Sequence, residues 1–203
     1  MIKNRFTKNV KYKRILILKS YNGDESMNNI IIYASCYGTT KMYANELSKE
    51  TNIKAVFFED IKDINIYDNI IYLGALYAGG VLGMKKTLKK LNNISNKNII
   101  LITVGLSDPK DEENIKNIRN NMKNQISKEI FENAKIFHLR GGIDYTKLKK
   151  SHKIMMKLLY NAVKKLPEEK KTAEDRAMIE TYDKKINFVD FSNLKNIIDE
   201  IKN

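Results

Sequence analysis

Several features are scarce in this chain, and each scarcity excludes a class of structure. Among the 203 residues there is one cysteine, Cys36, so no disulfide can form within the chain and a reducing compartment is expected. Two prolines and nine glycines argue against several domains joined by linkers. No apolar run approaches the roughly 20 residues that span a bilayer, and residues 15–18 are too short for a secretory signal. We therefore expect a cytoplasmic protein with one folded domain.

The net charge of +13 is unevenly distributed along the chain. Residues 1–26 contribute +5 and residues 140–171 contribute +7. Residues 27–139 contribute only +3, and residues 172–203 contribute −2. The basic excess thus lies mainly outside the predicted core, which weighs against nucleic-acid binding as the function of the whole protein.

Residues 1–26 show no sustained helical or strand periodicity and end in turn-forming residues directly before Met27. We expect a basic, poorly ordered extension there, or a translation that starts upstream of a native first residue at Met27. A basic arm that touches a membrane or an acidic partner is the alternative. Residues 27–203 are predicted to form the folded domain.

From Met27 onward, strand and helix patterns alternate. Short apolar runs predict five strands, at residues 30–34, 55–58, 70–73, 99–104 and 136–139. Helices are predicted at residues 40–49, 82–91 and 112–131, and around Leu194, Ile197, Ile198 and Ile201. Strands that alternate with helices form a parallel sheet with both faces covered, so the predicted fold is a doubly wound five-stranded α/β fold. Ligands of such folds bind beyond the carboxyl ends of the strands.

The loop at residues 35–40 joins the first strand to the first helix and is rich in hydroxyl groups. Its backbone N–H groups and the hydroxyls of Ser35, Thr39 and Thr40 can donate hydrogen bonds to a phosphate dianion. An ordinary capping turn remains an open interpretation, because Ser and Thr are common N-caps. The loop is neither a G-x-G-x-x-G nor a Walker sequence.

Two more loops follow the third and fourth predicted strands, at residues 74–80 and 103–109. They combine small residues, which let a flat ligand approach the backbone, with Tyr77, which can stack on a ring. Ordinary glycine-rich turns are the alternative. One loop suited to phosphate and two suited to a planar ring fit FMN better than a sugar or a peptide.

Residues 33–40 resemble the flavodoxin phosphate-loop signature, hydroxyl-x-Thr-Gly-x-Thr. Ser35, Gly38 and Thr40 match it, and Tyr37 replaces the usual threonine. Residues 139–145 and the Lys- and Met-rich helix after them depart from short flavodoxins and resemble the branch that includes menaquinone-dependent protoporphyrinogen oxidase. The resemblance covers about residues 27–203. This resemblance implies that the chain binds FMN on a sheet of strand order 2-1-3-4-5. The protoporphyrinogen-oxidising members of the family work at the membrane surface.

The residues predicted to bind FMN are Ser35, Cys36, Tyr37, Gly38, Thr39, Thr40, Ala75, Leu76, Tyr77, Ala78, Gly79, Gly105, Leu106 and Ser107. No catalytic residue and no metal ligand is predicted. His138 and His152 lack further ligands at metal-binding spacing and are interpreted as structural. Cys36 has no resolving cysteine and is interpreted as incidental. Asp108 and Asp144 follow strands, so they either face the flavin edge or cap solvated turns.

The region 147–166 predicts an amphipathic basic helix before the last helix. Its apolar stripe contains Leu148, Met155, Leu159, Ala162, Val163 and Leu166, and Lys149, Lys150, Lys153, Lys157 and Lys164 lie opposite. The pattern suits a helix docked on the domain with lysines in solvent. It equally suits a helix at an anionic membrane surface or a docking surface for an acidic redox partner.

Two functions are compatible with these features. The favoured hypothesis is an FMN-dependent oxidoreductase resembling protoporphyrinogen oxidase, which passes electrons from a porphyrinogen-type substrate to quinone at the inner face of the membrane. The alternative is a non-catalytic electron carrier that docks with redox proteins, although conventional flavodoxins are acidic. A degenerate domain without flavin is a third hypothesis, and the intact phosphate loop argues against it.

Overall fold

The computed structural model describes residues 27–77 and 79–202. These residues fold around a central parallel sheet. Across the sheet, the strands are β2 (Ala55–Phe57), β1 (Asn29–Ala34), β3 (Asn69–Tyr77), β5 (Asn98–Gly105) and β6 (Lys135–Arg140). Numbered along the chain among themselves, these five strands have the order 2-1-3-4-5, which confirms the predicted doubly wound topology. The predicted extension at residues 1–26 lies outside the described residues.

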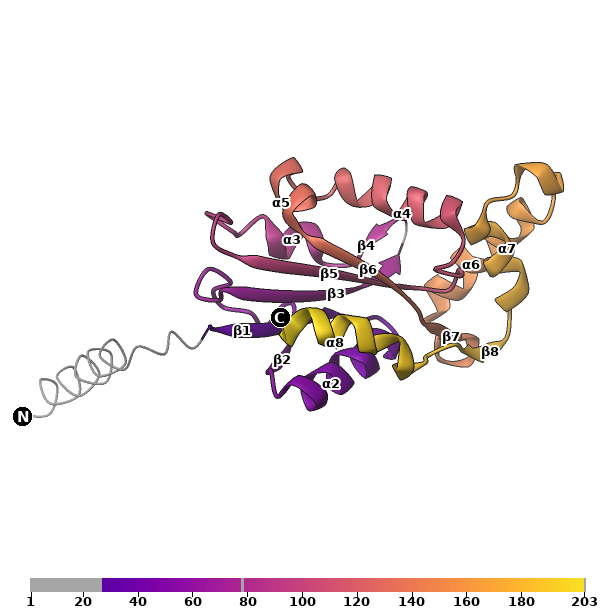
Figure 1. The fold of residues 1–203 in the computed structure, drawn as a ribbon. Coiled ribbons are helices and arrows are strands. Elements are labelled where there is room, and N and C mark those ends of the chain that lie inside the picture. Colours follow the sequence, from indigo (N-terminus) through magenta and orange to yellow (C-terminus); the bar gives the residue numbers. More distant parts are fainter. Residues whose placement is uncertain (1–26, 78, 203) are drawn as a thin grey trace, which may run out of the picture.

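Helices cover both faces of this sheet (Figure 1). One face carries α2 (Thr39–Thr51) and α8 (Lys195–Lys202), and the other carries α3 (Met84–Leu88), α4 (Glu112–Lys123) and α5 (Lys128–Asn133). Successive residues of a strand point to opposite faces, so Ile30 and Ile31 belong to different apolar clusters. Both are almost completely buried. The continuous apolar runs in the sequence reflect this burial on two sides.

Two predicted helices end earlier than expected. Residues 112–131 form α4 and α5 instead of one helix, because the Ser127 side chain accepts a hydrogen bond from the Ile130 N–H at 3.3 Å and starts a new helix. Between the two helices, Gln125 Oε1 accepts a hydrogen bond from the Val81 N–H at 2.9 Å. Val81 belongs to β4 (Gly80–Val81), a short strand antiparallel to β3, and of the helix predicted at residues 82–91 only Met84–Leu88 is helical.

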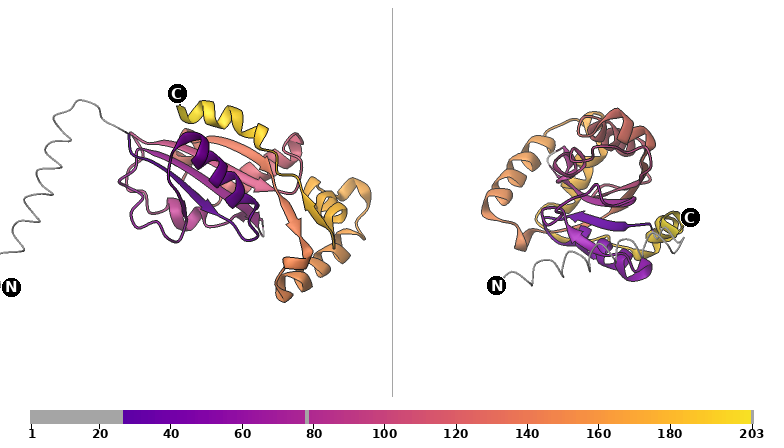
Figure 2. Two further views of the ribbon diagram at one scale, coloured as in Figure 1. Left: turned by 90° about the horizontal axis from the view of Figure 1, so that it is seen from below. Right: turned by 90° about the vertical axis from the view of Figure 1, so that its left-hand side faces the viewer.

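Between β6 and α8 the chain adds a segment that extends past the carboxyl ends of the strands (Figures 1 and 2). We call residues 141–190 the insertion. It contains β7 (Gly142–Asp144), α6 (Lys150–Val163), α7 (Ala173–Thr181) and β8 (Lys185–Asn187), with short 3-10 turns at Tyr145–Lys147 and Glu168–Lys170. Strands β7 and β8 pair antiparallel as a separate two-stranded sheet. Of these elements, the sequence predicts only the basic helix, α6.

Helix α6 is packed less completely than predicted. Within the predicted apolar stripe Val163 is buried, but Leu159 is 42% exposed. Ile154 and Leu158, outside that stripe, are 63% and 66% exposed. Helix α6 therefore presents apolar side chains as well as lysines to solvent. No helix within residues 27–77 and 79–202 has the length and apolar character needed to cross a membrane.

The buried Tyr43 on α2 connects the core to the point where the chain returns from the insertion. Its hydroxyl donates to the Arg140 carbonyl at 2.8 Å and accepts from the Asp190 N–H at 3.0 Å. Its ring meets Phe191 edge-on, with ring centroids 5.7 Å apart. One side chain thus holds both ends of the insertion near α2.

We expect Tyr43→Phe to lower the free energy of unfolding by about 1 to 3 kcal/mol, because it leaves a backbone carbonyl and a backbone N–H without their partner. Urea denaturation at pH 7 measures this change. Tyr33→Phe is the matched control, since Tyr33 is only partly buried in β1 and packs its ring on Phe57. Equal stability of Tyr43→Phe and the wild type would contradict the role of this hydroxyl.

Candidate functional site

The loop between β1 and α2 presents unpaired donors at a helix N-terminus. Gly38 is the N-cap of α2, has φ of +103°, and provides no side chain to cap the helix. The first intrahelical bond runs from the Met42 N–H to the Gly38 carbonyl at 3.0 Å, so the N–H groups before Met42 have no acceptor within the helix. Ser35 Oγ accepts a hydrogen bond from the Gly38 N–H at 3.0 Å and fixes the turn. This arrangement suits an anion.

Thr40 provides an independent indication of a ligand at this place. Its side chain is 0% exposed, yet its Oγ1 has no hydrogen-bond partner among the described residues. A buried hydroxyl without a partner costs about 1 to 3 kcal/mol, so a missing acceptor is expected beside it. Thr40 also lines the cavity described below. A phosphate oxygen at the N-terminus of α2 would satisfy this hydroxyl.

The loops after β3 and β5 form the adjoining wall. A Cβ on Gly105 would lie 2.6 Å from Leu76 Cδ1, which shows that the two loops are in close contact. Gly79 has φ of +76°, a conformation that side-chain-bearing residues rarely adopt. Apolar side chains of Leu76 and Leu106, together with Tyr77, line this wall. Such a surface suits a planar ring.

The insertion is attached directly to these loops through Arg140 at the end of β6. Arg140 Nε donates to the Leu106 carbonyl at 2.8 Å, and the guanidinium lies 3.6 Å from the ring centroid of Phe188. The next residue, Gly141, has its N–H bonded to the Gly105 carbonyl at 2.6 Å. A Cβ on Gly141 would lie 2.8 Å from Val104 Cγ1, so only glycine fits this close approach.

These elements enclose a cavity of about 610 Å³ at the carboxyl end of the sheet. Of the residues predicted to bind the cofactor, those that line it are Ser35, Cys36, Tyr37, Thr39, Thr40, Ala75, Leu76, Tyr77, Gly79, Gly105 and Leu106. Gly38 shapes the loop without lining the cavity, and Ser107 lines a smaller adjoining cavity of about 170 Å³. Ala78 lies outside the described residues. Binding by these residues stays a prediction, but the structure brings most of them together.

The far side of the cavity comes from the insertion and was not predicted from the sequence. Its lining residues there are Gly141, Gly142, Ile143, Leu148, His152, Met155, Met156, Leu159, Val163, Glu174, Asp175 and Met178. Most of these side chains are apolar, and several are the flexible methionines that fit ligands of varied shape. The cavity therefore has a polar end at the phosphate loop and a mostly apolar end lined by residues of α6 and α7.

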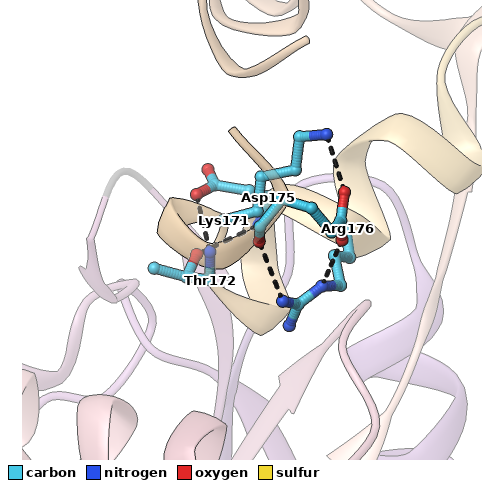
Figure 3. A network of polar contacts seen from close by, with 5 residues as sticks. Lys171, Thr172, Asp175 and Arg176 are labelled. Atoms are coloured by element: carbon cyan, nitrogen blue, oxygen red, sulfur yellow. Dashed lines mark hydrogen bonds and ion pairs between the residues drawn. The ribbon is translucent and has the colours of Figure 1, made fainter. Parts of the chain in front are cut away.

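A hydrogen-bond network fixes the first turn of α7, which lines the cavity (Figure 3). Thr172 Oγ1 accepts from the Asp175 N–H at 3.2 Å, and Asp175 Oδ2 accepts from the Thr172 N–H at 2.9 Å. This reciprocal pair is a capping box. Lys171 Nζ and Arg176 Nε both contact the Glu168 carboxylate, at 2.8 and 2.9 Å.

His152 lines the cavity and is bonded through both ring nitrogens. Its interpretation as structural stays a prediction. The Tyr37 hydroxyl bonds to Nδ1, and the Tyr77 hydroxyl bonds to Nε2 at 3.1 Å. The tyrosine that replaces a threonine in the phosphate-loop signature thus reaches α6. No sequence pattern indicated this contact, because the three residues are far apart in the chain.

The other residues singled out from the sequence have ordinary surroundings. Desolvation raises the pKa of the Cys36 thiol, and the Lys149 charge only partly opposes it, so Cys36 has no thiolate character at neutral pH. Asp108 Oδ1 accepts from the Lys110 N–H at 2.9 Å, and Asp144 Oδ1 accepts from the Thr146 N–H at 3.0 Å. Both aspartates therefore cap turns.

The described residues contain no cluster of His, Cys, Asp or Glu able to hold a metal ion. What the site offers is an anion-binding helix end, a wall for a planar ring and an apolar chamber beside it. The unpaired Thr40 hydroxyl and the uncapped end of α2 fit the phosphate of FMN, and the loops after β3 and β5 fit its ring. The cofactor predicted from the sequence is therefore compatible with the geometry of the site.

The chain resembles known proteins in sequence and in fold. The family model described as "Flavodoxin domain" matches residues 30–171. No curated protein matches the sequence closely enough to count as a relative. Among the solved structures similar to this chain is a flavoprotein from Bacteroides uniformis ATCC 8492, with 13% identity and a TM-score of 0.43; the match covers 60% of this chain and 96% of that chain. A flavoprotein in complex with FMN from Lactobacillus acidophilus NCFM has 15% identity and a TM-score of 0.38, with 57% of this chain and 93% of that chain covered. The flavodoxin of Streptococcus pneumoniae TIGR4 has 16% identity and a TM-score of 0.41, with 55% of this chain and 83% of that chain covered.

All three TM-scores are below 0.5, so the assignment depends on the family model. That model covers most of the chain, from β1 to a position just before α7, and includes all three loops of the cavity. The chain belongs to the flavodoxin domain family.

Proposed function

We propose that this chain binds FMN in the cavity and acts as an oxidoreductase of the protoporphyrinogen-oxidising type, with a quinone as electron acceptor. The main support is the apolar chamber that α6 and α7 add beside the ring-binding loops. An electron carrier needs only an accessible ring edge, whereas an enzyme that oxidises an organic substrate needs room for that substrate next to the ring. FMN supplies the redox chemistry, and the protein orients it and limits its contact with water.

The residues have separate roles in this proposal. The phosphate loop, with Ser35, Thr39 and Thr40, holds the phosphate, and the loops at Tyr77 and Leu106 contact the ring. Methionines 155, 156 and 178 line the chamber for an apolar, extended substrate. Burial and the neighbouring Asp175 raise the pKa of Glu174, which lines the cavity beside these methionines.

Purified protein is expected to be yellow and to release FMN on denaturation. After anaerobic reduction of FMN-loaded protein, addition of protoporphyrinogen and a quinone tests the reaction. Turnover supports the enzyme. Reduced protein that transfers electrons to a redox protein but never turns over these substrates would favour the alternative, a non-catalytic carrier. A colourless preparation that does not bind added FMN would count against both the enzyme and the carrier.

We also propose that α6 meets an anionic membrane surface. Ile154 and Leu158 are more than 60% exposed, and no described element covers them. The exposed lysines 150, 153 and 157 lie on the same helix, next to this apolar face. An apolar face flanked by lysines is typical of helices that lie in the headgroup region of anionic bilayers.

Replacing both Ile154 and Leu158 by serine is expected to lower binding to anionic vesicles by about 10-fold or more, because two apolar side chains no longer enter the bilayer. Co-sedimentation with phosphatidylglycerol vesicles at low salt measures this. Ile66→Ser is the matched control, since Ile66 is 59% exposed but lies outside the insertion. Wild-type protein that stays in the supernatant would contradict membrane binding and favour an acidic protein partner.

A further inference from the structure

His152 is the histidine among the described residues that line the cavity. The titratable or charged groups around it come from each neighbouring element: Cys36 and Tyr37 from the phosphate loop, Tyr77 from β3, Lys149 from the turn before α6, and Glu174 and Asp175 from α7. Histidine is the side chain most often used in proteins both to accept and to donate a proton, so His152 is the candidate among these groups.

The hydrogen bonds of His152 form a continuous chain across the cavity. Tyr37 Oη lies against Nδ1, and Tyr77 Oη lies 3.1 Å from Nε2. In neutral imidazole one nitrogen donates and the other accepts, so one tyrosine must donate to the ring while the other accepts from it. The chain joins the phosphate loop to the ring-binding loop through α6. Each hydroxyl can pass a proton on by accepting one and donating its own.

We propose that His152 is the proton-transfer residue of the flavin site and that Tyr37 and Tyr77 complete its relay. This inference depends on the proposed function. FMN, when bound, would supply the two-electron chemistry: of the two electrons and two protons that an organic donor loses, it would take both electrons and one proton. The second proton passes through the Tyr77 hydroxyl to His152, which becomes imidazolium. His152 then returns this proton to water through Tyr37, which restores the neutral relay; the electrons leave separately, to the quinone of the proposed function.

The relay links the charge of His152 to the redox state of the cofactor. A protonated His152 would stabilise negative charge on a reduced flavin, so the midpoint potential of FMN would rise as His152 takes up a proton. A plot of potential against pH, measured on the FMN-loaded full chain between about pH 5.5 and 8.5, is expected to bend where His152 titrates. His152→Gln keeps hydrogen-bonding groups but cannot bind the proton, so this bend is lost.

His138→Gln is the control, because His138 is the other of the two histidines and lies outside the cavity, bonded to Thr103 at 2.7 Å. This variant is expected to keep the bend. A second measurement needs no substitution: in the wild type, the pKa of His152 followed by NMR rises when dithionite reduces the bound FMN.

Two results would overturn the relay and leave FMN binding intact. One is a potential curve of His152→Gln that superimposes on that of the wild type, and the other is a His152 pKa that does not change on reduction. A loss of FMN affinity with the bend preserved would make His152 structural and equally overturn the relay. Failure of the wild type to bind FMN would instead overturn the proposed function and the relay together.

Discussion

Replacing Gly38 by valine and Thr40 by alanine in one variant is expected to weaken FMN binding by at least about 100-fold, because both hold the phosphate end of the cofactor. Thr40→Ala removes the buried Oγ1 that lacks a partner among the described residues. Gly38→Val places a branched side chain at φ of +103°, where the loop must change its conformation. The backbone N–H groups of the first turn of α2 then no longer converge on one anion.

The two changes can be separated by their effects on the protein without cofactor. A Cβ on Gly38 meets no atom within 4 Å, so the cost of Gly38→Val arises from the backbone and not from a clash. Thr40→Ala removes an unsatisfied polar atom and should leave the stability of the flavin-free protein unchanged or slightly raised. Fluorescence titration with FMN gives the affinities, and urea denaturation gives the stabilities.

Thr51→Ala is the matched control for the threonine. Thr51 ends the same helix, and its Oγ1 already donates to the Leu47 carbonyl at 2.6 Å. We expect this variant to bind FMN like the wild type. If the double variant at Gly38 and Thr40 also bound FMN with wild-type affinity, the phosphate would have to lie elsewhere and the proposed function would lose its basis.

The sequence predicted those parts of the fold that local patterns determine. The strands read as apolar runs because helices cover both faces of the sheet, and the topology follows from the alternation of strands with helices. The loops of the cavity could also be located, because the carboxyl ends of parallel strands lie at one edge. Loop residues as far apart as Ser35 and Leu106 therefore share one cavity, as expected.

The insertion could not be placed from the sequence, because contacts distant in the chain determine its position. His152 lies 115 residues from Tyr37 and 75 residues from Tyr77, and no local pattern joins them. Helix α6 has apolar residues on two adjoining sides, of which Met155 faces the cavity and Ile154 faces solvent. An amphipathic pattern indicates that a helix has an apolar face, but it does not show which part of a wide face is covered.

His138 shows how a polar group in the sheet makes this fold sensitive to acid. Burial, together with the Arg119 charge, lowers its pKa from 6.5 to about 4. Its Nδ1 is bonded to Thr103 Oγ1, and its buried Nε2 has no partner among the described residues. The folded protein thus keeps His138 neutral over a pH range in which the unfolded chain protonates it.

The direction in which pH changes the free energy of unfolding follows from this difference in protonation between the folded and unfolded states. Above pH 6.5 both states carry a neutral His138, and its contribution to stability is fully present. As the pH falls from 6.5 to about 4, only the unfolded state gains the proton, so the free energy of unfolding decreases. The full decrease is at most about 3 kcal/mol, and solvent screening at this partly exposed site reduces it. Aspartates with lowered pKa values, such as Asp63 and Asp190, lose their contributions only at still lower pH.

Urea denaturation at pH 7 and at pH 4.5 measures this prediction. The wild type is expected to lose most of the His138 contribution between these two values, whereas His138→Leu should show a clearly smaller loss because it has no proton to bind. Equal pH dependence of wild type and His138→Leu would show that another group, and not the neutral imidazole against β5, sets the acid sensitivity of the fold.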